Sequence, residues 1–256
     1  MTTKPDLTET LDRKIKIGAR RETVFRYFTD SARFAKWWGA GSQIEATPGG
    51  AMLIQYPNGI SASGEVVEVE APRRIVFTYA TPGQTPSDAS LVTITLEEIE
   101  QGTLLKLHHA FSSAKIRDHF VQGWRHQLAL FSKAVSEELH ARVSERVDAY
   151  LRAFCDPDGK TRRSLLETCA TPGIVFRDAF SATEGLDEML ANLEAVQVYM
   201  PGMTLARAGD VRLSHGTAVA DWTASAADGS PRGKGTNVYD LSPDGLISRV
   251  VGFWGS

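Results

Sequence analysis

Two aspartates in the second half of the sequence are the main candidates for chemistry. Asp178 follows three apolar residues, Ile174 to Phe176, so we expect it at the end of a buried strand. Burial would raise the pKa of its carboxyl group toward the range that a general base needs. Asp221 lies between apolar neighbours in another predicted strand and is the candidate catalytic partner of Asp178. A capping or ion-paired role for Asp178, without catalysis, is the alternative.

Other side chains of the second half could hold a ligand beside these aspartates. Phe176 lies on the same predicted strand as Asp178, and three further candidates lie on the closing strands: Asn237, Tyr239 and Trp254. In an enzyme, Asn237 or Tyr239 would stabilise a developing oxyanion while Asp178 removes a proton. The neighbouring Arg177 is not expected to join them, because adjacent strand residues point to opposite faces.

The first half is rich in large side chains that could line a ligand pocket. Trp and Tyr bury much apolar area while keeping a polar group that can orient a ligand. The candidates are Trp37, Trp38, Met52, Tyr56, Tyr79, Phe111 and Trp124. For each residue alone, ordinary core packing is the alternative. Because so many large side chains with polar groups occur together, the group as a whole predicts a pocket for a small hydrophobic molecule.

Histidines and cysteines do not form a metal-binding pattern. His108 and His109 are adjacent on a predicted strand, so only one can face the pocket. We take His109 as a candidate polar contact, with a hydrogen-bonded structural histidine as the alternative. His119 and His126 share a helix face but lie about 10 Å apart at 1.5 Å per residue, too far for one ion. We therefore predict no metal and, without phosphate-loop, dinucleotide or Gly-x-Ser-x-Gly motifs, no cofactor.

The composition is that of a globular protein. Of 256 residues, 42% are hydrophobic and 23% are charged, with a net charge of −3. Without a cluster of basic residues we expect no nucleic-acid partner. The polar N-terminus and the lack of an apolar run near 20 residues argue against a signal peptide and a membrane span. Two cysteines without redox spacing favour a cytoplasmic protein.

Hydrophobic periodicity predicts an α+β fold in two domains, residues 1–140 and 141–256. In the first domain we expect a strand at 11–17, two short helices and a long final helix at 114–142. Five strands lie between them, at 52–56, 61–70, 75–79, 91–99 and 103–111. Their short links predict antiparallel pairing. Gly123, inside the long helix, is expected to allow a close approach to the sheet.

The second domain has its elements in a different order, so the chain is not an internal repeat. Helices are predicted first and most of the sheet last. The predicted helices are 143–154, 161–169 and 185–198, and the predicted strands are 174–178, about 213–225, 233–241 and 247–254.

The first half resembles the START-like superfamily, in the branch similar to the C-terminal domain of the activator of the heat-shock-protein-90 ATPase. The motifs that carry this resemblance are residues 25–30, Trp37-Trp38-Gly39, Pro48-Gly49-Gly50, residues 64–69, residues 72–79 and Gly123-Trp124. It implies a helix-grip fold, in which a curved antiparallel sheet wraps a long C-terminal helix and leaves a cavity. The first strand begins near Leu11, which leaves no room ahead of it for a chaperone-binding domain, so we do not expect chaperone binding.

The second half looks like the nuclear-transport-factor-two-like group that includes SnoaL-type polyketide cyclases. The motifs are Tyr150-Leu151 with Phe154, residues 175–178, Gly185, residues 218–222 and residues 244–247. The resemblance implies a cone-shaped α+β barrel domain with helices packed into a strongly bent sheet. Relatives that open epoxides use two aspartates and an arginine, and relatives often dimerise through the exposed sheet face, so a homodimer is compatible with the sequence.

Two functions fit these observations. The first is a non-catalytic carrier or sensor that binds a small hydrophobic ligand in pockets between helices and sheet. The alternative is a cofactor-independent enzyme of the cyclase, isomerase or hydratase type, with Asp178 as the general base.

Overall fold

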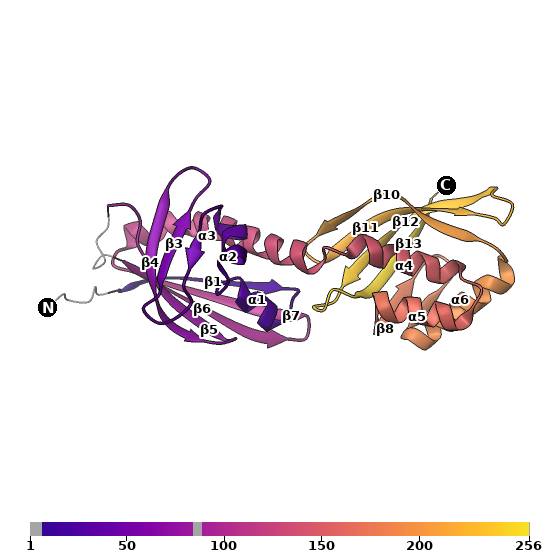
Figure 1. Cartoon of the computed structure of the whole chain (residues 1–256), viewed down its shortest axis with the longest axis horizontal. Helices are drawn as coiled ribbons and strands as arrows, with labels where there is room; N and C mark the ends of the chain where they lie inside the picture. Colours follow the sequence, from indigo (N-terminus) through magenta and orange to yellow (C-terminus); the bar gives the residue numbers. More distant parts are fainter. Residues whose placement is uncertain (1–6, 84–88, 256) are drawn as a thin grey trace. The chain divides into compact units, whose positions relative to one another are not determined.

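The computed structural model describes residues 7–83 and 89–255 and divides into two compact units, residues 1–135 and 136–256 (Figure 1). Each unit combines one β-sheet with helices, so the predicted α+β class is confirmed. The boundary falls within one helix, α3. We call the two parts the N-terminal unit and the C-terminal unit. None of the helices in the described ranges is long and apolar enough to cross a membrane.

The N-terminal unit is built on a seven-stranded sheet with the order β1-β7-β6-β5-β4-β3-β2, in which all the pairs formed by described strands are antiparallel. Short links containing Gly or Pro join most of these strands, as the sequence predicts. The elements are β1 (Glu9–Ile17), α1 (Arg21–Arg26), α2 (Ser31–Trp38), β2 (Gln43–Ile44), β3 (Ala51–Gln55), β4 (Ser61–Glu70), β5 (Arg74–Tyr79), β6 (Ser90–Ile99), β7 (Gly102–Phe111) and α3 (Ala114–Leu139).

The long helix α3 closes one side of this sheet with a buried apolar stripe. Trp124, Leu128 and Phe131 are buried at the i, i+4 and i+7 spacing of one helix face. The ring of Phe131 stacks on Phe28 with centroids 4.9 Å apart, and the hydroxyl of Tyr27 donates to the carbonyl of Ala134 at 3.1 Å. These contacts hold the residues after α1 against α3. An antiparallel sheet followed by a long helix fits the helix-grip fold that the resemblance implies.

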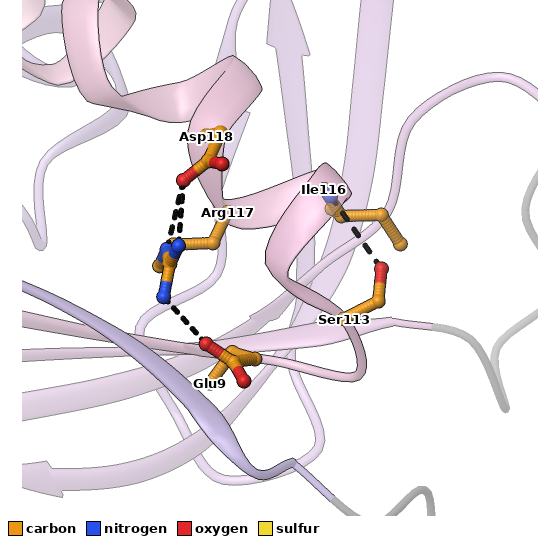
Figure 2. Close-up of polar contacts among 5 residues, drawn as sticks. All are labelled: Glu9, Ser113, Ile116, Arg117 and Asp118. Atoms are coloured by element: carbon orange, nitrogen blue, oxygen red, sulfur yellow. Dashed lines mark hydrogen bonds and ion pairs between the residues drawn. The ribbon is translucent and has the colours of Figure 1, made fainter.

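Polar contacts fix the start of α3 on the first strand (Figure 2). Ser113 Oγ accepts a hydrogen bond from the backbone N–H of Ile116 at 3.5 Å and so helps to cap the helix. Arg117 donates to Glu9 of β1 at 2.5 Å and to Asp118 at 2.8 Å. The first turn of α3 is thereby tied to the sheet edge, at the end of the helix that bounds the cavity described below.

The C-terminal unit has a six-stranded sheet with the order β10-β11-β12-β13-β8-β9, in which the β13–β8 pair is parallel. The sheet has two ends in this order, so the described strands do not close into a barrel. The elements are α4 (Val143–Cys155), α5 (Gly159–Cys169), β8 (Ala170–Arg177), β9 (Ala182–Glu184), α6 (Leu186–Tyr199), β10 (Thr204–Ser214), β11 (Thr217–Ser225), β12 (Pro231–Leu241) and β13 (Ile247–Gly255).

Two strands of this sheet, the short β9 and the longer β10, were not predicted. The strand expected at about 213–225 begins only at Thr217, and residues 204–214 form the separate strand β10. None of the β10 side chains is fully buried, and the strand contains a bulge between Ala208 and Arg212. An edge strand of this kind has no strong hydrophobic alternation, which is the signal that sequence periodicity relies on.

Candidate functional site

The C-terminal unit contains a cavity of about 440 Å³ between its helices and its sheet, which we call the C-terminal cavity. It is bounded by α4, α6 and the strands β8 and β10–β13. Its lining is mainly apolar, with a few polar groups. The lining residues are Leu151, Phe154, Phe176, Asp178, Phe180, Ser181, Asn192, Val196, Tyr199, Met200, Met203, Leu205, Trp222, Asn237, Gly252 and Trp254.

Two hydrogen bonds orient the Asn237 side chain in the wall of the C-terminal cavity. Its Oδ1 accepts a hydrogen bond from Trp222 Nε1 at 3.0 Å, and its Nδ2 donates to the hydroxyl of Tyr239 at 3.1 Å. An amide nitrogen carries two hydrogens, so one remains without a described protein acceptor and is available to a ligand. Tyr239 is fully buried and lies behind Asn237, outside the cavity lining.

Asp178 lies in the same cavity and accepts three hydrogen bonds. Its Oδ1 accepts from the backbone N–H groups of Phe180 and Ser181 at 2.8 and 2.7 Å, and its Oδ2 accepts from Trp254 Nε1 at 3.2 Å. These donors fix the orientation of the carboxyl group. The expectation of a buried carboxyl group was wrong, because Asp178 is half-buried at the cavity wall. It caps its own turn and also presents an oxygen to the cavity.

Asp221 is not brought together with Asp178. The buried neighbours of Asp221, Ala220 and Trp222, face the interior, so the alternation of strand β11 places the Asp221 carboxylate on the exposed face. There it accepts from Thr236 Oγ1 at 2.5 Å and pairs with Arg212 at 3.7 Å. The pair of aspartates expected from the sequence is therefore absent from this cavity.

Sequence reasoning missed Trp222, the side chain that orients Asn237. Trp222 is buried, lines the cavity and contacts Trp254 edge-on with ring centroids 4.9 Å apart. The signal was available, because the alternation that puts Asp221 outward puts Trp222 inward. Phe180 and Tyr199, also missed, lie at the rim of the cavity with exposed fractions of 78% and 83%. Large exposed aromatic side chains of this kind are typical of a ligand entrance or a contact surface.

The N-terminal unit contains a second cavity, of about 350 Å³, which we call the N-terminal cavity. It lies between α3 and side chains from α2, β5 and the loop after β3. Four predicted residues line it, namely Trp38, Tyr56, Tyr79 and Trp124. The other lining residues are Asn58, Ile60, Thr81, His119, Phe120, Gly123, His126 and Gln127.

Three predicted residues of the N-terminal unit belong to the core instead. Trp37 packs edge-on against Phe131 at 5.0 Å and donates its Nε1–H to the carbonyl of Tyr27 at 3.1 Å. Met52 and Phe111 are buried and lie outside the cavity lining. These three side chains are therefore part of the hydrophobic core and do not line the cavity.

His109 is also buried behind the cavity, and its hydrogen bonds fix its protonation state. Ser90 Oγ donates to the carbonyl of Tyr79 at 2.9 Å, so it must accept from His109 Nε2 at 2.7 Å. Trp124 Nε1 donates to His109 Nδ1 at 2.9 Å. Burial, together with His108, lowers the pKa of His109 to about 3. His109 is thus a neutral structural histidine whose nitrogens are both occupied, so it is not a contact for a ligand.

Gly123 does not bring α3 close to the sheet, contrary to the expectation. It is exposed, it lines the N-terminal cavity, and a Cβ atom built on it would meet no atom within 4 Å. The missing side chain therefore leaves open space beside the cavity. His119 and His126 are exposed on the same part of α3, and the described residues contain no group of three His, Cys, Asp or Glu side chains that could hold a metal ion.

One family matches the N-terminal part of the chain. Residues 18–136 match the family described as activator of Hsp90 ATPase homolog 1-like protein. The resemblance predicted for the first half of the sequence is thereby confirmed. No curated protein matches the chain.

Several solved structures are similar to parts of the chain. One is a putative isomerase of the SnoaL-like family from Agrobacterium tumefaciens, with 26% identity over 46% of this chain and 99% of that chain, at a TM-score of 0.43. Another is CalU16 from Micromonospora echinospora, with 27% identity over 53% and 80% of the two chains, at a TM-score of 0.41. A third is the Aha1 dimer from Colwellia psychrerythraea, with 18% identity over 47% and 91%, at a TM-score of 0.42.

Proposed function

We propose that this protein binds a small hydrophobic molecule in the C-terminal cavity and acts as a non-catalytic carrier or sensor. The observation that carries the proposal is the cavity itself. Its volume of about 440 Å³ and its mainly apolar wall are those of small-molecule sites, which typically place a few fixed polar groups in an apolar enclosure. Burial of about 200 Å² of ligand surface would contribute roughly 5 kcal/mol.

The polar groups of the wall define how such a ligand would be oriented. Asn237 offers one N–H donor, and the carboxylate of Asp178 accepts three hydrogen bonds where an ionised carboxylate has about four acceptor sites. A ligand with a hydroxyl group can donate to Asp178 and accept from Asn237. An apolar molecule with one hydroxyl, such as 2-naphthol, is therefore a suitable probe.

The experiment is native mass spectrometry of the freshly purified full chain, followed by denaturation and identification of any released molecule. We expect a discrete apolar molecule, or added 2-naphthol, bound at one equivalent. The variant Val196→Trp places a large side chain in the cavity from α6 and should abolish binding. If the variant still bound the released molecule or 2-naphthol, or if the unmodified protein bound neither, the proposal would be contradicted.

A second candidate function, a cofactor-independent enzyme, is favoured by the position of Asp178. Its carboxyl group lies at an apolar cavity wall that also contains an oriented amide donor, Asn237. A carboxylate can remove a proton, and an amide N–H can stabilise the oxyanion that develops. The variant Asp178→Asn should abolish turnover of a hydroxylated polyketide-like substrate with the fold intact. An unchanged rate would remove Asp178 from the mechanism.

The predicted homodimer also remains a proposal. The exposed face of the C-terminal sheet carries ion pairs, including Arg212 with Asp221 and Arg249 with Asp240. A dimer through this face would need its charged pairs to match across the interface, so it should weaken as salt rises. Light scattering at low and high salt measures the dimer at each salt concentration.

A pull-down would test the separate expectation that no chaperone binds.

A further inference from the structure

We propose that the N-terminal cavity is a second, separate binding site, for an uncharged and largely apolar molecule that carries a hydrogen-bond acceptor oxygen such as a ketone. The hydroxyl pair of Tyr56 and Tyr79 supplies the donor. The sequence already predicts a hydrophobic pocket in this unit, and the inference adds the chemistry of its ligand, which differs from that proposed for the C-terminal cavity.

The hydroxyl pair has one donor more than it uses. The two hydroxyl oxygens lie 2.6 Å apart, so one O–H donates to the other. Each tyrosine hydroxyl carries one hydrogen, and neither makes a further hydrogen bond to a described residue. Burial raises the pKa of both groups, so both stay protonated near neutral pH. One O–H is therefore left to donate, and both residues line the cavity.

The ring of Trp38 also lines the cavity, beside the tyrosine pair. Trp38 lies edge-on to Tyr56 with ring centroids 5.8 Å apart, and its buried Nε1–H has no partner in the described part of the chain. The other four tryptophans all use their N–H groups. Trp37 donates to Tyr27, Trp124 to His109, Trp222 to Asn237 and Trp254 to Asp178. The Nε1–H of Trp38 is itself covered by the protein, so the tyrosine pair is the donor that a ligand in the cavity could meet.

The lining excludes a charged ligand. Among the described residues of the lining there is no Asp, Glu, Lys or Arg, and the two histidines, His119 and His126, are exposed at the edge of the cavity. A charge buried here would lack a counter-charge, whereas a neutral carbonyl would meet a phenol donor. The cavity therefore selects for an uncharged acceptor.

Benzophenone and diphenylmethane are the probes that isolate this acceptor, because both carry two phenyl rings on one carbon and only benzophenone has a carbonyl oxygen. Calorimetric titration of the full chain should show that benzophenone binds about tenfold more tightly, as expected for one added hydrogen bond. Equal affinity for the two probes, or no binding of benzophenone, would overturn the proposal.

The double variant Tyr56→Phe/Tyr79→Phe tests the donor itself. It keeps both rings, and because the hydroxyls pair with each other, their joint removal leaves neither partner unsatisfied and should preserve the fold. We expect the preference for benzophenone over diphenylmethane to disappear. A preference that survives in this variant would overturn the assignment of the tyrosine pair.

Blocking variants locate the site. Gly123→Trp fills the open space beside the cavity and should abolish benzophenone binding, while Gly123→Ala adds only a Cβ that meets no atom within 4 Å and should retain it. Val196→Trp blocks the C-terminal cavity and should leave benzophenone binding unchanged. If Val196→Trp abolished binding and Gly123→Trp did not, the second site would be excluded while the function proposed for the C-terminal cavity would stand.

Discussion

The two cavities of this protein share an architecture and differ in their hydrogen-bonding chemistry. Both are lined by residues from helices and from a sheet with its loops, and both have largely apolar walls. The C-terminal cavity contains a carboxylate and an amide whose partners already hold them in place. The N-terminal cavity contains a pair of phenol groups, Tyr56 and Tyr79, with one unused O–H donor. The fold therefore provides the enclosure, and two or three polar side chains determine which ligand it can accept.

The difference also separates groups that stabilise the fold from groups that await a ligand. Asn237 joins Trp222 and Tyr239 in one buried chain of hydrogen bonds, so its loss leaves two partners unpaired. The hydroxyls of Tyr56 and Tyr79 pair only with each other among described residues. Removal of one partner from a buried network costs far more than removal of both partners from an isolated pair.

The largest effect is expected from a change that breaks the C-terminal network. Asn237→Leu leaves Trp222 Nε1 and the hydroxyl of Tyr239 buried without partners, at about 1 to 3 kcal/mol each. We expect a loss of roughly 3 kcal/mol in the free energy of unfolding, measured by urea titration. The matched control, Tyr56→Phe/Tyr79→Phe, should change it by less than about 1 kcal/mol. Similar losses in the two variants would remove this distinction between the cavities.

A smaller effect concerns pH and the histidine behind the N-terminal cavity. Because the folded pKa of His109 is about 3 and the unfolded value is 6.5, the unfolded chain binds more protons below pH 6.5. Neutral His109 therefore makes stability fall as the pH falls from 6.5 toward 3, by up to about 1.4 kcal/mol per pH unit. At pH 5 the loss is roughly 2 kcal/mol.

The variant His109→Gln isolates this contribution, because glutamine keeps polar atoms but does not titrate in this range. Urea titrations at pH 7, 6 and 5 should show a shallower pH dependence for the variant than for the unmodified protein. His140, with a pKa lowered by burial to about 4, remains in both proteins and cancels in the comparison. Parallel pH profiles would mean that His109 becomes charged without cost, contrary to its observed hydrogen bonds.

The smallest effect compares a glycine from each cavity. Gly123→Ala should raise the free energy of unfolding by up to about 1 kcal/mol, because alanine favours the helix and its Cβ meets open space. Gly252→Ala should lower it, because the Cβ would lie 3.2 Å from both Asn237 Oδ1 and Asp178 Cβ. Thermal unfolding of the two variants measures both signs. A loss of stability in Gly123→Ala would show that α3 is packed more closely there than the structure indicates.

Much of this arrangement could be predicted from the sequence, and the limits have physical causes. Periodicity located α3, the antiparallel strands and the helices that precede the second sheet. It missed β2 and β9, which are only two and three residues long, and β10, whose side chains are never fully buried. Composition identified the aromatic residues of the first half but not which of them line the cavity. Only the structure shows that Trp38 lines the cavity while Trp37 packs in the core. Strand alternation predicts that Asp221 and Trp222 face opposite sides of β11. Because an apolar Trp222 is expected to face inward, Asp221 could have been placed outside the site from the sequence.

Hydrogen-bond partnership was beyond the reach of the sequence. The neutral state of His109 depends on Ser90 and Trp124, which lie 19 and 15 residues away along the chain. The unused donor of Trp38 is likewise defined by the absence of an acceptor among the described residues around it. Both properties arise from tertiary contacts, whereas local patterns determine only which elements form.

The most direct test of the account is native mass spectrometry of the full chain with 2-naphthol and benzophenone present together. We expect both molecules bound at one equivalent each, with 2-naphthol lost in Val196→Trp and benzophenone lost in Gly123→Trp. Such a result would establish two hydrophobic binding sites with different polar requirements. A bare protein mass, or two probes that displace each other and respond to the same variant, would contradict it.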